Sequence, residues 1–354
     1  MARRRLTIIA LAVATAGAVL YGALWLFAAS ILDEEVEAWA AERRAEGWQV
    51  EFGTRHMAGF PFRLIQRITA PSLAGAIGGT MRRWRGPETE IEFRPWRPDE
   101  IRLRFPGSHR IEIDTAKPAK ILTIEAAGAD AMLRREAEGG GQTLNLTFEG
   151  LMVGLPGTVT DQGKGSGTAI DHLAVTVEAA PQTAADDHLT ASARLVVTLG
   201  GLVLPAATRP ALGYRIESFV LDAAVMGRIA RGPPIETLAA WRDAGGTIEL
   251  RRLNIVWSDL VFESDGTVAL NAKMQPMGSM SARFSGFRKT IDSLVAARSI
   301  TPGNAITARI VLGLLAKTPR GGGPPRIKTS LTAQDGALYL GPVKITALPR
   351  INWR

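Results

Sequence analysis

Residues 90–114 have the sequence EIEFRPWRPDEIRLRFPGSHRIEID, and this stretch decides the fold class. Apolar and charged side chains alternate in three runs that start about ten residues apart, near residues 91, 101 and 111. The turn-forming sequences RPD (97–99) and PGS (106–108) separate the runs. Alternation with a period of two between short turns predicts an antiparallel meander that is apolar on one face and charged on the other.

The same alternation recurs towards the C-terminus. The clearest runs are residues 144–148, 173–177, 189–197, 219–225, 248–250, 268–272 and 280–284. In total the chain has about fifteen candidate strands, nearly all with one apolar face. So many strands do not fit one flat sheet without curling or splitting. We therefore predict a mainly β fold, with a long curved antiparallel sheet that is sandwich-like or groove-like.

Helical spacing interrupts the strands in three places. A short helix is expected around residues 235–241, after a pair of prolines, and a domain sub-boundary is predicted near residue 230. Apolar residues at helical spacing predict a second helix over 287–295. Thr301 and Pro302 have the cap and first-turn chemistry that opens a third, which carries Ile306, Ile310, Val311, Leu314 and Leu315. The last two helices predict a C-terminal hairpin packed on the sheet.

An uncharged segment near the N-terminus predicts a membrane anchor. Three arginines precede residues 6–29, and 24 residues make about 36 Å of helix, enough to cross a hydrocarbon core of about 30 Å. Tyr21, Trp25 and Phe27 lie near its far end, and acidic residues follow. Residues 1–5 are therefore expected in the cytoplasm, and everything after the anchor on the other side.

Two other interpretations of this segment remain open. A signal peptide could be cleaved at Ala28-Ala29-Ser30, but its apolar region is normally about 7–15 residues long. A buried core helix would not be expected to begin with three arginines. Residues 30–47 continue the helical pattern as a stalk that ends at Gly47, and residues 48–354 are predicted to form the β-rich domain.

The sequence GFPFRL at residues 59–64 predicts a turn that leads into a strand. In that strand Phe62, Leu64 and Ile68 should share one face, with Arg63 and Arg67 on the other. A binding loop near the membrane is the alternative interpretation, and the turn chemistry alone favours the structural one.

Composition excludes several chemistries. The chain has 42 Lys and Arg against 34 Asp and Glu, dispersed along its length, which is typical of a solvated surface and not of a nucleic-acid partner. It has no cysteine, so disulfides, thiol nucleophiles and cysteine-bound metals are excluded. The Asp-His pairs at 171–172 and 187–188 lack the spacing of metal ligands, and the glycine-rich residues 163–167 do not match a phosphate loop. We expect no cofactor, no metal and no enzymatic activity.

Several segments resemble one family. They are the helix with Trp39 and Gly47, GFPFRL at 59–64, DGTVALNAKMQPMG at 265–278 and QDGALYLGPVKITALP at 334–349. Together with the anchor they resemble an uncharacterised envelope family, mainly alphaproteobacterial, called domain of unknown function 2125. The resemblance spans nearly the whole chain. It implies a protein tethered to the bacterial inner membrane with a periplasmic domain, and it supplies no catalytic residues. More distantly, an anchor followed by a long amphipathic sheet is similar to the AsmA-like proteins, which are implicated in envelope lipid traffic.

Two functions from different classes follow. In the first, the sheet holds lipid or another apolar ligand in a groove, with Leu103, Phe105, Leu270 and Phe284 as expected contacts. In the second, the sheet is a filled core and the protein is a scaffold or assembly factor for other envelope proteins. The choice depends on whether the apolar faces close on one another or leave an open groove.

Overall fold

The computed structural model describes residues 2–77, 80–114, 120–136, 140–154, 167–181, 188–230, 234–318, 322–341 and 343–351. The chain forms two compact units. Unit 1 contains Met1–Thr123 and Asp130–Leu133, and unit 2 contains Ile124–Ala129 and Arg134–Arg354. The predicted sub-boundary near residue 230 falls inside unit 2, between two strands that pair with each other. Each unit is described by itself.

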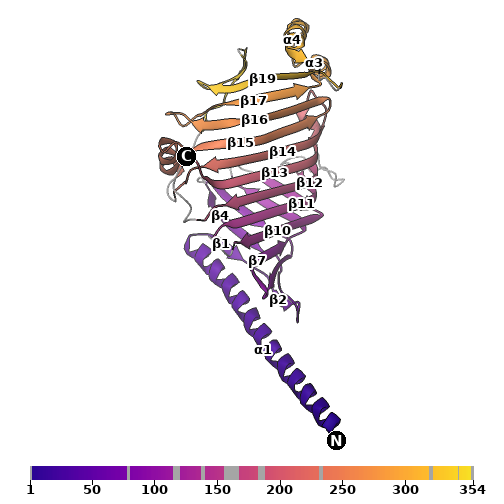
Figure 1. Cartoon of the computed structure of the whole chain (residues 1–354), viewed down its shortest axis with the longest axis vertical. Helices are drawn as coiled ribbons and strands as arrows, with labels where there is room; N and C mark the ends of the chain where they lie inside the picture. Colours follow the sequence, from indigo (N-terminus) through magenta and orange to yellow (C-terminus); the bar gives the residue numbers. More distant parts are fainter. Residues whose placement is uncertain are drawn as a thin grey trace. The chain divides into compact units, whose positions relative to one another are not determined.

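Unit 1 begins with one long helix, α1 (Ala2–Ala45), which joins the predicted anchor and stalk without a break (Figure 1). It is long and apolar enough to cross a membrane, a property that signal sequences near an N-terminus share. Gly47 ends it as predicted, with φ of +90°. Its N–H donates to Arg44 O (3.0 Å) and the Trp48 N–H donates to Arg43 O (3.0 Å), so two carbonyls of the last turn are satisfied.

The strands of unit 1 pair antiparallel in two groups. The first is, in order, β1 (Gln49–Glu51), β4 (Ser72–Ile77), β5 (Thr80–Arg85) and β8 (Gly107–Ile113). The second is β2 (Arg55–Ala58), β3 (Leu64–Ile68), β6 (Thr89–Arg94) and β7 (Arg97–Arg104). Residues of β9 (Lys120–Ala126) and β10 (Gly128–Arg135) are divided between the two units.

The three-stranded meander predicted for residues 90–114 forms only in part. β6 and β7 pair as expected, but β8 pairs with β5, and β7 also pairs with β10. A strand has two edges, and alternation fixes which side chains share a face without fixing which strand occupies an edge.

Helix α1 covers one face of β3 and β6. Trp25, Ala29 and Leu64 form a buried cluster, and Phe93 packs against it. Phe62 is not on this face, contrary to the prediction, because it precedes β3 in the turn and its surface is 70% exposed. Leu64 and Ile68 are buried and Arg67 is exposed, as expected.

The charged face of β6 and β7 is less exposed to solvent than predicted. Glu92 and Glu100 are buried, whereas Ile101 is exposed. Arginines explain how the carboxylates are tolerated: Arg94 contacts Glu92 at 2.8 Å, and Arg102 contacts Glu100 at 2.6 Å. Buried charges persist where they are paired in this way.

Unit 2 is built on long antiparallel strands, each paired with its neighbour in the chain (Figure 1). They are β11 (Gln142–Gly154), β12 (Thr168–Ala179), β13 (Ala191–Val203), β14 (Arg215–Met226), β15 (Thr247–Trp257), β16 (Leu260–Leu270) and β17 (Pro276–Ser285). Next come β19 (Arg326–Gln334), β20 (Ala337–Leu340) and β21 (Val343–Ala347), with the short β18 (Ala316–Lys317) beside β19. A 3-10 turn (Ala206–Thr208) lies between β13 and β14. The mainly β, antiparallel fold class is confirmed.

Three helices complete unit 2: α2 (Pro234–Asp243), α3 (Phe287–Ala296) and α4 (Pro302–Leu315). Thr301 caps α4 by accepting a hydrogen bond from the Asn304 N–H (3.2 Å), as its sequence predicted. α3 and α4 form the expected hairpin on the sheet, with a core of Phe287, Ile291, Ala305 and Ile327.

Candidate functional site

The strand registers of unit 2 align apolar side chains into rows that run across the sheet. The longest row contains, in strand order, Phe148, Leu173, Leu199, Phe219, Ile255, Phe262, Phe284 and Ile327. A second row contains Leu146, Val175, Val197, Leu221 and Leu253. A third contains Leu144, Val177, Leu195, Ala223 and Leu250. These three rows make up what is called here the apolar face.

Most of the apolar face is only half-buried. Every member of the longest row except Ile327 keeps part of its surface in water, and Leu195 is 37% exposed. The buried cluster found among the described residues of unit 2 is the one beneath the α3–α4 hairpin, and it reaches Phe284 and Ile327 at one end of the row. α2 packs at strand ends instead, where Trp241 Nε1 donates to Met226 O (2.8 Å). Within the described part of unit 2, no helix therefore packs over the middle of the apolar face.

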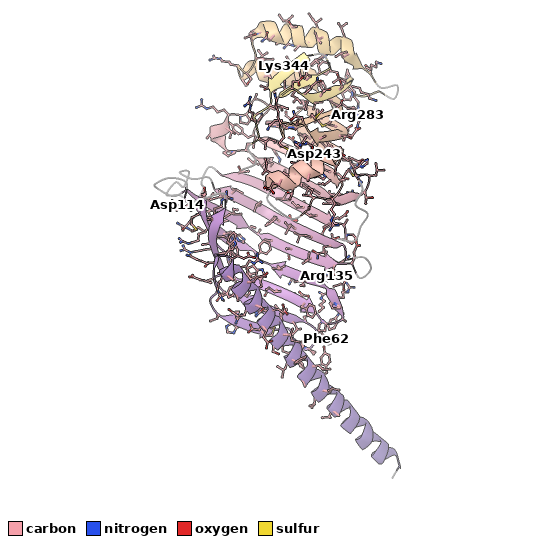
Figure 2. The ribbon with its side chains drawn as sticks, turned by 90° about the vertical axis from the view of Figure 1, so that its left-hand side faces the viewer. Phe62, Asp114, Arg135, Asp243, Arg283 and Lys344 are labelled. Carbon is pink, nitrogen blue, oxygen red and sulfur yellow. The ribbon has the colours of Figure 1, made fainter. Side chains whose placement is uncertain are left out.

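The opposite face of the same strands is polar and ion-paired. Arg194 on β13 donates two hydrogen bonds, of 2.9 and 2.8 Å, to the carboxylate of Asp222 on β14. The Arg194 guanidinium thereby holds the pKa of the Asp222 carboxyl below its ordinary range. Arg283 on β17 binds Asp265 at 2.7 Å and likewise lowers the pKa of that carboxyl; Figure 2 labels Arg283 among the side chains of these strands. Ion pairs thus lie between the strands on this face, whereas the three apolar rows contain no charged residue.

The four predicted ligand contacts are divided between the units. Leu270 ends β16 opposite Pro276 and lies outside the three rows, whereas Phe284 is on the longest row, where the α3–α4 hairpin already packs against it. Leu103 on β7 and Phe105 after it belong to unit 1 and are half-buried. The Phe105 ring contacts His109, at 5.8 Å between ring centroids, which gives it a structural role.

The centre of the apolar face was missed as a site by sequence reasoning. Phe219 was assigned to a strand, whereas Leu199 lies just beyond the predicted run 189–197, and nothing in the sequence singles out either residue. What makes them central is the pairing of β13 with β14, and that register follows from the assembled sheet.

The predicted polar candidates have ordinary partners. Asp171 binds Arg215 at 2.6 Å, and His172 Nδ1 lies 2.6 Å from Glu149 Oε1. His188 is exposed, whereas Asp187 and the glycine-rich residues 163–167 lie wholly or mostly outside the described residues. Across the part of the chain that the structure describes, no three His, Asp or Glu side chains are grouped as metal ligands would be.

His109 is the one buried histidine among those described. Burial lowers its pKa, although the hydrogen bond to the Phe105 carbonyl acts in the opposite direction. Its Nδ1 accepts from Trp84 Nε1 (3.3 Å), and its Nε2 lies 2.9 Å from Phe105 O. Both ring nitrogens are therefore engaged, as in a neutral histidine that holds a turn together.

A cleft of about 490 Å³ brings together the two C-terminal segments that carry the family resemblance. Lys273 and Gln275 come from the first segment, and Asp335 and Leu348 from the second. Turn chemistry explains much of it: Asn271 Oδ1 accepts from the Lys273 and Gln275 N–H groups (2.9 and 3.0 Å).

The fold and this site define a class: a mainly β chain of long antiparallel strands with one half-exposed apolar face, preceded by an apolar helix that can span a membrane. Residues 25–349 match the family described as "Uncharacterized protein conserved in bacteria (DUF2125)", and the chain belongs to this family. No curated protein and no solved structure matches the chain. The matched range includes the part of α1 that packs on β3 and all of the apolar face.

Proposed function

We propose that this chain is a non-catalytic, membrane-anchored protein of the bacterial cell envelope that holds lipid acyl chains, or a similar apolar ligand, on the apolar face of unit 2. The observation that carries the proposal is the half-buried state of the apolar face, which the α3–α4 hairpin contacts at one end, at Phe284 and Ile327. Continuous exposed apolar surface beyond a few hundred Å² usually marks a binding site. A bound acyl chain would remove such surface from water at about 25 cal/mol per Å².

The position of the anchor supports a lipid as the ligand. Residues 6–29 would hold the protein in the inner membrane, with the three N-terminal arginines in the cytoplasm and the strands in the periplasm. In that orientation the apolar face stays attached to a source of lipid. No nucleic acid, metal or cofactor enters this proposal.

Two adjacent valines on β13 allow a matched test. Val197 is on the apolar face, between Val175 and Leu221, whereas Val196 is on the polar face opposite Asp222. A photo-crosslinking amino acid placed at either position of the full chain in cells should give lipid adducts at 197 and few at 196. Mass spectrometry of the purified protein should also find more lipid than on an unrelated periplasmic protein. Equal adducts at both positions, or no lipid above that background, would contradict the proposal.

The alternative function, a scaffold for other envelope proteins, is favoured by one observation. α4 exposes much of its apolar surface: Ile306 is 57%, Ile310 59% and Leu314 82% exposed. The sequence predicted that these residues pack on the sheet, but Ala305, Ala308 and Leu312 do so instead. A crosslinker at Leu314 that captures one discrete protein, combined with no lipid at 197, would establish the scaffold function.

A further inference from the structure

Two hairpin tips of unit 1 lie side by side. Residues 59–63 join β2 to β3, and Pro95 and Trp96 join β6 to β7. Because Leu64, the first residue of β3, pairs with Phe93 near the end of β6, both tips are at the same end of the strand group. They are called the paired tips below.

The paired tips are aromatic and basic. Phe60 is 59%, Phe62 70% and Trp96 55% exposed, which is unusual for three large apolar side chains so close together. Arg63 and Arg97 are also exposed, and the carboxylates that they approach, Glu92 and Glu100, are buried. The exposed side chains of the paired tips therefore include three aromatic rings and two guanidinium groups; Figure 2 labels Phe62.

Helix α1 holds the first tip directly. Trp25 Nε1 donates to Arg63 O (3.0 Å), and the Tyr21 hydroxyl donates to Pro61 O. The Phe60 ring packs against both aromatic side chains, with its centroid 5.5 Å from that of Trp25 and 6.4 Å from that of Tyr21. The tip is thereby fixed at the level of residues 21–25 of the helix.

This level lies near the far end of the predicted span, residues 6–29. Measured from Leu6 at 1.5 Å per residue, Tyr21 lies about 22 Å and Trp25 about 28 Å along the helix. The hydrocarbon core is about 30 Å thick, so Trp25 falls where the core gives way to the headgroups, and Tyr21 lies about 8 Å inside that boundary. Aromatic rings and arginines are the side chains that this layer favours, the arginines most strongly beside anionic lipids.

We propose that the paired tips insert Phe60, Phe62 and Trp96 into the interfacial layer of the same membrane that α1 crosses. Unit 1 then has two membrane contacts, the helix and the tips, so that it cannot rotate freely about the anchor. GFPFRL would then be a turn that also binds the membrane surface, which joins the structural interpretation of this segment to its alternative, a binding loop near the membrane. The occupant is a lipid surface because α1, which carries the tip, already lies in one. This inference depends on the anchor and not on any ligand of unit 2.

The absence of native cysteines makes a direct test simple. Single cysteines at Phe62, Trp96 and Glu88 in the full chain would be labelled with an environment-sensitive fluorophore. The protein would be reconstituted in vesicles of phosphatidylethanolamine and phosphatidylglycerol. Glu88 is the matched control because it is exposed and precedes β6, about 20 Å along the strand direction from Arg94.

The labels at 62 and 96 should emit at shorter wavelength than the label at 88, and spin-labelled lipids should quench them more strongly. Phe62 and Trp96 are mostly exposed, so their replacement leaves the Trp25–Arg63 contact in place, and circular dichroism checks the fold. Water-like emission without quenching at 62 and 96 would overturn the inference, whatever crosslinks form at Val197. Equal quenching at all three positions would overturn it as well, because the contact would then not be specific to the tips.

Discussion

Alternating strands meet different surroundings in the two units of this chain. In unit 1, the apolar side chains of β3 are covered by α1, and Leu64 and Ile68 are buried. In unit 2, Leu199 and Phe219 alternate in the same way but remain half-buried, with no described helix of that unit over them. Alternation therefore identifies which side chains share an apolar face. Whether that face is buried depends on a distant segment, such as α1, that packs over it.

The largest expected effect is a difference between two leucine truncations. Leu64→Ala should lower the free energy of unfolding by about 2–5 kcal/mol, since it leaves a cavity in a fully covered site. Leu199→Ala should cost no more than about 1–2 kcal/mol, because part of that side chain is already in contact with water. Urea unfolding of the full chain in detergent, with hydrogen exchange resolving each unit, measures both.

Equal losses for the two variants would contradict the comparison, because they would mean that the apolar face of unit 2 is covered in solution. Leu199→Ala should lower the free energy of unfolding less in lipid-free protein than in lipid-bound protein. That result would strengthen the comparison, since a bound acyl chain would bury Leu199 as α1 buries Leu64.

A smaller effect on stability is expected at the contact between α1 and the residue that precedes β3. Trp25→Phe keeps an aromatic ring but removes the hydrogen bond to Arg63 O, which should cost about 1 kcal/mol. The loss should be seen as faster hydrogen exchange in β3, with β13 of unit 2 unchanged. Phe27→Leu is the control, because Phe27 is 65% exposed on the same helix. Faster exchange in the control variant as well would mean that the effect comes from the helix in general and not from this contact.

The smallest effect concerns the polar face of unit 2. Asp222→Asn should cost about 0.2–1 kcal/mol at neutral pH, the usual range for an ion pair that water reaches. The folded-state pKa of Asp222 is depressed. The stabilisation is therefore complete above the unfolded value of about 3.9, and it is lost as the pH falls through the lower folded-state pKa.

The difference in stability between wild type and Asp222→Asn should accordingly disappear in acid, as measured by urea titrations at a series of pH values. A difference that grows as the pH falls would show that this carboxyl is not stabilised by Arg194.

Local patterns in the sequence predicted elements well and partners poorly. The Gly47 stop and the Thr301 cap depend on chemistry within a few residues, and they are confirmed. The clearest alternating runs also fall on strands, whereas β4, β5, β9 and β10 were not predicted. The pairing of β8 with β5 and the burial of Glu92 among arginines depend on contacts between distant segments, and these were not foreseen. For the candidate site, the alternation predicted an apolar face, but its central residues became visible only once the registers were known.

The neighbour-to-neighbour pairing of β11 to β17 also has a consequence for the order of folding. Each of these strands can pair with the next strand in the chain as soon as that strand has been made. Each pairing then closes only a short loop and loses little conformational entropy. Unit 1 cannot proceed in this way, since β3 must wait for β6 and β5 for β8. During N-to-C synthesis, the folding of unit 1 should therefore be the slow step, and the sheet of unit 2 should grow from β11 by one strand at a time.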